Sequence, residues 1–159
     1  MIQIELKIHL LNSIRRSRSL IIGDLQALNR DQASTSPGGK ARPAVHFVSE
    51  CGYVNGMIAD FCQSGEIHRL SLEEKRNHLA SFDTVEKAIN YLSRETDRLL
   101  EAVEHADLSN LSEACSPLGR MMSRLEVLEL PAMHMMYHDG QLNYIQSLHG
   151  DEEIHWGKE

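Results

Sequence analysis

The chain has 159 residues, a length that favours one domain spanning residues 1–159. Apolar residues make up 42% and charged residues 25%, which is typical of a globular protein and excludes a largely disordered chain. The formal charge of -7 disfavours nucleic acid and anionic lipid as partners, because both carry negative charge themselves.

No stretch of the sequence is apolar over the roughly eighteen residues that a membrane span requires. The first residues also lack the order of charged start, apolar stretch and cleavage site that marks a signal peptide. We therefore expect a cytoplasmic protein without a membrane partner. Cys51, Cys62 and Cys115 are odd in number and form no CxxC motif, so we interpret them as reduced thiols.

Apolar residues follow helical spacing in four long windows, two of them in the N-terminal half. The first helix is predicted over about residues 3–28, and the second runs from Pro43, which suits a first helical turn, to about Gly65. The segment 29–42 between them is rich in Gly, Ser, Asn and Pro, which predicts a loop long enough to cross a bundle. The apolar stripes are Leu10, Ile14, Ile21, Leu25 and Leu28 in the first window and Phe47, Cys51, Val54, Ile58 and Phe61 in the second.

The third window, residues 82–103, alternates apolar steps of three and four, a pattern typical of left-handed helix bundles. Asp83 with Glu86 three residues later predicts the start of this helix. The stretch 106–119 has the composition of a connection.

The fourth helix is predicted to open with Ser123 and Glu126, which have capping-box spacing, and to run to about Leu148. Pro131 lies inside it and predicts a kink or a loss of the first turns. No strand pattern competes with the helices. The sequence therefore predicts an all-α protein, a four-helix bundle with long crossover connections.

Two histidines in the last predicted helix form the most informative pattern. His134 and His138 stand four residues apart, so their side chains project side by side, on a stripe that also contains apolar residues. Two imidazoles in this arrangement can share one metal ion, or they can be hydrogen-bonded residues of the core.

A third metal ligand would have to come from another helix. The second helix offers His46 and Glu50, one turn apart beside its apolar seam, and either residue could face the pair. Imidazole and carboxylate both suit zinc, nickel or ferrous iron. In the competing interpretation Glu50 hydrogen-bonds a core histidine and His46 lies at the edge of the bundle.

The last helix also carries a family resemblance. The run from His134 to Gln146 fits the pattern HxxYHDGQLNYIQ, which resembles the last helix of the DinB-like (DNA-damage-inducible) metalloprotein superfamily. The resemblance implies a four-helix bundle with a long first crossover and one divalent metal ion, nickel or zinc in most cases, with iron or manganese as further options. It implies as ligands one histidine of the second helix and the two histidines of the last helix, here His134 and His138. It also implies a homodimer and, from the better-understood relatives, reactions of low-molecular-weight thiols such as bacillithiol or mycothiol.

Other polar residues near the histidine pair have two interpretations each. Asp139 and Gln141 could accept hydrogen bonds that orient an imidazole, or could simply form a polar turn of helix. Cys51, on the apolar seam, is expected to be inert, whereas Cys115 lies in a connection and is the better candidate for a reactive thiol. Trp156 could anchor the acidic tail on the bundle or on a partner subunit.

Two functions from different classes follow. The first is a metal-dependent enzyme, a thiol-dependent S-transferase or a hydrolase, in which the metal activates a thiolate or water against a small-molecule substrate. The second is a non-catalytic binding or stress-response module that the metal only stabilises. An accessible polar pocket beside the metal site would favour the enzyme, and a closed apolar core would favour the module.

Overall fold

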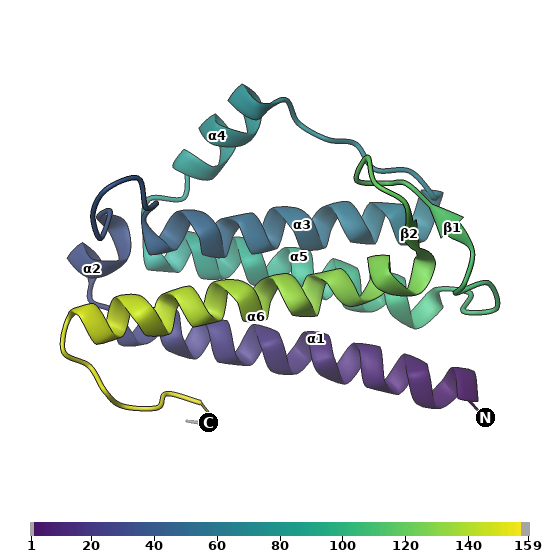
Figure 1. The fold of residues 1–159 in the computed structure, drawn as a ribbon, viewed down its shortest axis with the longest axis horizontal. Helices are drawn as coiled ribbons and strands as arrows, with labels where there is room; N and C mark the ends of the chain where they lie inside the picture. The colour runs from purple at the N-terminus through teal and green to yellow at the C-terminus, as the bar shows by residue number, and fades with distance from the viewer. Residues whose placement is uncertain (1, 157–159) are drawn as a thin grey trace.

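The computed structural model describes residues 2–156 of the chain and shows an all-α protein, as predicted. Its body is a bundle of four long helices, and the shorter elements lie in the connections between them (Figure 1). The long helices are α1 (Ile2–Ala27), α3 (Ala44–Ser64), α5 (Val85–His105) and α6 (Arg124–Leu148). The short elements are α2 (Arg30–Ser34), α4 (Leu72–Ala80), β1 (Ala114–Cys115) and β2 (Met122–Ser123).

The helices do not follow a simple up-and-down order. Helix α3 packs against α5 and α6, and α1 packs against the same two helices from the other side. Figure 1 shows that α3 and α5 run in the same direction, so the connection 65–84 with α4 returns along the outside of the bundle. The connection that spans the length of the bundle is therefore this second one, whereas segment 29–42 joins α1 to α3 at one end.

Helix boundaries follow from local capping chemistry. Ser123 and Glu126 form the predicted capping box at the start of α6, and Gly65 ends α3 with a φ of 78°, a backbone conformation that glycine adopts without strain. The predicted start of α5 was wrong by one residue. Thr84 is the cap, its hydroxyl accepting from the Lys87 N–H, because the Asp83 carboxylate is instead paired with the Lys87 ammonium group.

Three predictions about the connections and the last helix need correction. Segment 29–42 contains the short helix α2, because Asn29 and Gln32 cap each other's backbone N–H groups. The chain also forms one antiparallel pair of two-residue strands, β1 and β2, which is too short for a periodic pattern to reveal. Pro131 does not shorten α6, which begins at Arg124 and continues through the proline.

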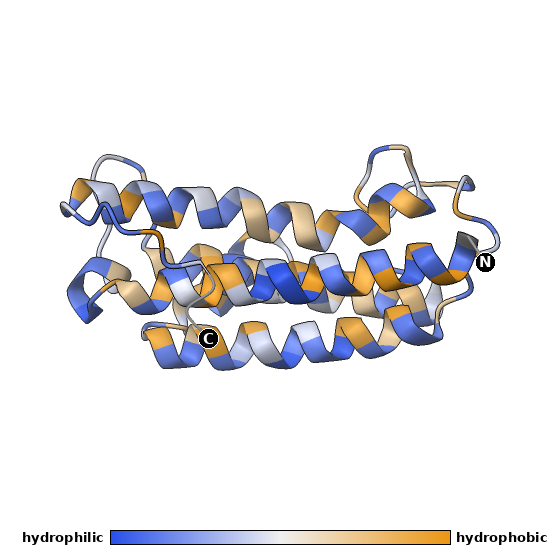
Figure 2. Ribbon diagram, turned by 90° about the horizontal axis from the view of Figure 1, so that it is seen from below, coloured by the Kyte–Doolittle hydropathy of each residue, from blue (hydrophilic) through white to orange (hydrophobic). Residues whose placement is uncertain are grey.

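The apolar stripes predicted for the first two long helices are buried in one core. The long helices nearest the viewer in Figure 2 carry both hydrophobic and hydrophilic residues along their length. Two glycines allow α3 to approach α5 closely. A Cβ on Gly52 would lie 2.9 Å from the Tyr91 ring, and one on Gly56 would lie 2.7 Å from the Glu95 carboxylate. No helix within residues 2–156 is long and apolar enough to cross a membrane.

Candidate metal centre

The two histidines of α6 converge on one point inside the bundle. The Nε2 atoms of His134 and His138 lie 3.2 Å apart, with the ring centroids separated by 4.6 Å. Two nitrogen ligands of a tetrahedral zinc ion, each at about 2.0–2.1 Å, are separated by about 3.3 Å. The spacing of the pair therefore fits a shared metal ion.

Two neighbours hold the ring of His138 in place. Gln141 Oε1 lies 2.7 Å from His138 Nδ1, and Phe47 of α3 stacks on the ring at 5.2 Å with an interplanar angle of 10°. Because an amide oxygen only accepts, Nδ1 carries the proton and Nε2 presents its lone pair toward His134. Of the two interpretations considered for Gln141, its hydrogen bond to His138 favours the orienting one.

A cysteine completes the group. The Sγ atom of Cys51 and one nitrogen from each of His134 and His138 all lie within 4.8 Å of one another. Cys51 is fully buried, and it was expected to be an inert core thiol because it lies on the apolar seam of α3. The same seam faces the histidine pair in the folded bundle, which periodicity along one helix cannot show.

Burial sets the protonation states of this group. Burial, reinforced by the neighbouring His138, lowers the pKa of His134 to about 4, and burial also lowers the pKa of His138. Both imidazoles are neutral near pH 7, which is the form that binds metal ions. Burial, together with the negative charge of Glu50, raises the pKa of the Cys51 thiol well above its ordinary value. A buried thiolate would need a compensating positive charge, which a metal ion provides.

Glu50 lies next to the histidine pair but is already engaged with two cations. Its Oε2 is 3.7 Å from His138 Nε2 and 2.6 Å from Arg42 Nη2, while Oε1 accepts a short hydrogen bond from Lys75 Nζ. Burial alone would raise the pKa of Glu50, but the bonds from Lys75 and Arg42 outweigh it and lower the pKa to about 2. Glu50 is therefore ionised and lies between the pair and the two cations.

His46 is not one of the three clustered residues. It lines a surface pocket with Glu50, and burial and the charge of Arg42 lower its pKa, so it is neutral near pH 7. The pocket has a volume of about 240 Å³ and also takes in Lys75 and Arg76 of α4. Glu50 thus belongs both to the pocket and to the surroundings of the histidine pair.

Asp139 does not orient either histidine. It is buried against Asp24 of α1, and this burial, together with the contact between the two carboxyl groups, raises the pKa of Asp139 to about 8. Asn143 and Trp156 both donate to Asp24 Oδ2, at 2.8 and 3.2 Å. The tail therefore docks on the bundle of its own chain, one of the two arrangements expected for Trp156.

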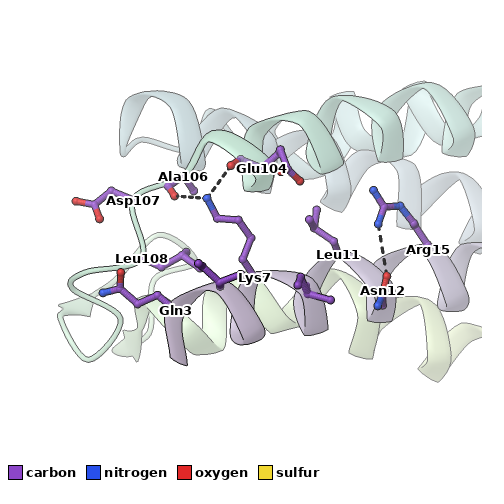
Figure 3. A pocket seen from close by; sticks show the side chains of 11 residues that line it. Gln3, Lys7, Leu11, Asn12, Arg15, Glu104, Ala106, Asp107 and Leu108 are labelled. Atoms are coloured by element: carbon purple, nitrogen blue, oxygen red, sulfur yellow. Dashed lines mark hydrogen bonds between the residues drawn. The ribbon is translucent and has the colours of Figure 1, made fainter. Parts of the chain in front are cut away.

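Two other candidate features lie away from the cluster. Cys115 in β1 donates weakly to the Met122 carbonyl oxygen, and burial raises the pKa of its thiol, which makes it less reactive. A larger pocket of about 610 Å³ lies between the first turns of α1 and the end of α5 (Figure 3). Lys7 in this pocket is bonded to the Glu104 and Ala106 carbonyl oxygens.

Comparison with solved structures defines the class of fold. The chain has an all-α fold built on four long helices, as predicted. It is similar to the crystal structure of a histidine-to-alanine mutant of a mycothiol-dependent maleylpyruvate isomerase, with a TM-score of 0.67 and 16% sequence identity. The match covers 86% of this chain but only 60% of the isomerase chain. No protein-family model matches the sequence, and no curated protein matches it.

Proposed function

We propose that His134, His138 and Cys51 bind one divalent transition-metal ion. The observation that carries the proposal is the convergence of their three donor atoms within 4.8 Å inside an otherwise well-packed bundle. Two imidazoles and a thiolate favour zinc or nickel over magnesium, calcium or manganese, because sulfur is a soft donor.

Glu50 and His46 remain candidate ligands. Glu50 would complete a two-histidine, one-carboxylate set if its carboxylate exchanged a cation partner for the metal ion. Its Oε2 atom lies 3.7 Å from His138 Nε2, so the carboxylate would move only a short distance. His46 lines the surface pocket with Glu50 and is not one of the three clustered residues. Cys51 already belongs to the cluster and gives up no cation partner, which makes it our first choice.

We further propose that the chain is a metal-dependent enzyme that acts on a small molecule and uses a low-molecular-weight thiol. When bound, the metal ion would act as a Lewis acid that lowers the pKa of a thiol or of water. Gln141 and Phe47 fix His138, and burial keeps both imidazoles neutral at working pH. The polar pocket at Glu50 supports this function, and so does the shared fold of a thiol-dependent isomerase.

A non-catalytic, metal-stabilised module is the second candidate. It is favoured by the burial of the cluster, since His138 is only 3% exposed and Cys51 is fully enclosed. The two functions differ in whether a thiol reaches the metal. Titration of cobalt-substituted protein with a small thiol such as 2-mercaptoethanol should change the visible absorption spectrum for the enzyme and leave it unchanged for the module.

The metal site is tested by replacing His138 with alanine. Untagged wild-type protein should retain one divalent ion per chain after dialysis, and the His138→Ala variant should lose it, because two remaining ligands seldom hold such an ion against a chelator. His105→Ala is the matched control, because His105 is exposed in the last turn of α5, where its ring is hydrogen-bonded to the Glu101 carbonyl oxygen. Elemental analysis measures the ion, and wild-type protein without it would refute the proposal.

We also propose a homodimer. Exposed apolar residues line one face of α6, and no other element of residues 2–156 covers them. They are Met133, Tyr137, Tyr144 and Leu148.

A further inference from the structure

The pocket beside the candidate metal centre carries an excess of positive charge. Its lining includes Arg42, Lys75 and Arg76, opposed only by Glu50, while His46 is neutral near pH 7. The net formal charge of this lining is therefore two positive units. The protein as a whole carries -7, so a basic pocket at this position is not a general property of its surface.

The three cations come from segments that are far apart in the sequence. Arg42 precedes α3, whereas Lys75 and Arg76 lie on α4, and the fold brings α4 over the N-terminal half of α3 (Figure 1). Arg42 also lines a neighbouring pocket of about 330 Å³ together with Lys40, Phe47 and Gln141. The basic lining thus extends to Phe47 and Gln141, the two residues that hold the His138 ring in place.

Glu50 separates this basic lining from the histidine pair. One carboxylate oxygen accepts from Lys75, and the other lies 2.6 Å from Arg42 and 3.7 Å from His138 Nε2. Glu50 therefore occupies the position that an anionic group would take between the two cations. Arg76 has no ion pair within residues 2–156, although it lines the same pocket.

We propose that this pocket binds the anionic end of a small molecule, a carboxylate or phosphate group, through Arg76, Lys75 and Arg42. Cations lining a semi-enclosed cavity attract and orient such groups, and a molecule bound there extends toward the His134–His138 pair. As a substrate site the pocket depends on the proposed metal function, but its affinity for anions does not. Glu50 opposes binding, because it competes for the same cations.

The test uses succinate as a carboxylate probe, inorganic phosphate as a second probe and uncharged succinamide as a control, measured by isothermal titration calorimetry. Succinate should bind one to one. Arg76→Met should weaken this binding about tenfold by removing a cation, and Glu50→Gln should strengthen it about tenfold by removing the competing carboxylate. Arg16→Met, an exposed arginine of α1, is the matched control and should have no effect. Circular dichroism establishes that each variant is folded.

Arg76→Met and Glu50→Gln are expected to change succinate affinity in opposite directions, whereas general damage to the fold would weaken binding in both variants. If phosphate bound more weakly to Arg76→Met and more tightly to Glu50→Gln while succinate did not bind, the pocket would be assigned to phosphate groups rather than carboxylates. Absence of binding by both anions up to about 10 mM, or equal weakening by Arg16→Met and Arg76→Met, would overturn the inference. Metal content measured on the same samples distinguishes the two proposals, since each can fail while the other holds.

Discussion

His138 contacts residues of both helices that form the candidate site. Its ring stacks on Phe47, its Nδ1 is bonded to Gln141, and its Nε2 faces both His134 and Glu50. These contacts come from two helices and fix the ring plane and the tautomer together. A ligand held in this way loses little conformational entropy when a metal binds, which favours tight binding.

The identity of the third ligand can be determined from the pH dependence of metal binding. Burial raises the pKa of the Cys51 thiol, so coordination by Cys51 must release one proton near neutral pH, whereas Glu50 is already ionised. If Cys51 is the ligand, apparent zinc affinity should rise about tenfold per pH unit between about pH 6 and pH 8. Competition with a chelator of known affinity measures this slope.

The same experiment on Cys51→Ser provides the control. Its pH profile should be much flatter over that range, because no thiol proton has to be released and burial lowers the pKa of both imidazoles. A flat profile in the wild-type protein would exclude Cys51 and leave Glu50 or His46 as the third ligand.

Asp139 is expected to make the free energy of unfolding fall as pH rises from about 4 to about 8. Its pKa is about 8 in the folded protein and near 3.8 when unfolded, so between these values the folded state binds the extra proton. This contribution to the free energy of unfolding is fully present below the unfolded value and is lost as pH rises through about 8. The loss has a slope of up to about 1.4 kcal/mol per pH unit. Chemical denaturation between about pH 5 and pH 9 should show this decline in the wild type, levelling off above about pH 8, and it should be absent in Asp139→Asn.

Part of the site follows from sequence and part depends on the assembled fold. The spacing of His134 and His138 places their side chains together on any helix, so the pair could be predicted. The approach of Cys51 depends on how α3 is rotated against α6, and no pattern within one helix specifies that rotation. The cations around Glu50 include Lys75 on α4, a helix that the periodicity did not predict because Leu79 is the only residue of α4 that is buried.

At the scale of elements, the closeness of α3 and α5 depends on glycine. We predict that Gly52→Ala destabilises the protein by about 1–3 kcal/mol, because the new Cβ would lie 2.9 Å from the Tyr91 ring and 3.2 Å from the Leu92 backbone. This cost exceeds the gain in helix propensity, which is about 1 kcal/mol.

Gly140 provides the matched substitution in α6. Apart from the neighbouring backbone of α6, no atom of residues 2–156 lies within 4 Å of the position that its Cβ would occupy, so Gly140→Ala should stabilise the protein by about 0.5–1 kcal/mol. Thermal or chemical denaturation of both variants measures the difference. Equal effects in the two variants would contradict a role for Gly52 in the α3–α5 contact.

The long helices were predictable because each buries one apolar stripe with helical spacing. The short elements were not. Helix α2 depends on the reciprocal capping of Asn29 and Gln32, and the pair of β1 and β2 depends on two strand contacts across a connection. Such elements carry too few apolar residues for periodicity to detect, so the crossover through α4 was also missed.

At the scale of the whole molecule, the exposed face of α6 predicts self-association. Tyr137 and Tyr144 are 65% and 66% exposed, seven residues apart on the same face, and apolar side chains exposed in a row often mark an interface. Sedimentation should give twice the chain mass of 18.0 kDa for the wild type.

Tyr144→Glu should shift this protein to monomer by placing a charge in the interface. Glu73→Gln, which changes an exposed residue at the start of α4, should leave the mass unchanged. A concentration-independent mass of 18.0 kDa for the wild type would refute the dimer.

The docking of the tail has an optical consequence. The chain contains one tryptophan, and its indole N–H donates to Asp24, a buried residue of α1 that also faces Asp139. Intrinsic tryptophan fluorescence therefore arises from a single, identified position. Because Asp24 also contacts Asp139, ionisation of Asp139 should change the surroundings of the indole, and the tryptophan emission of the native protein then reports that proton without an added label.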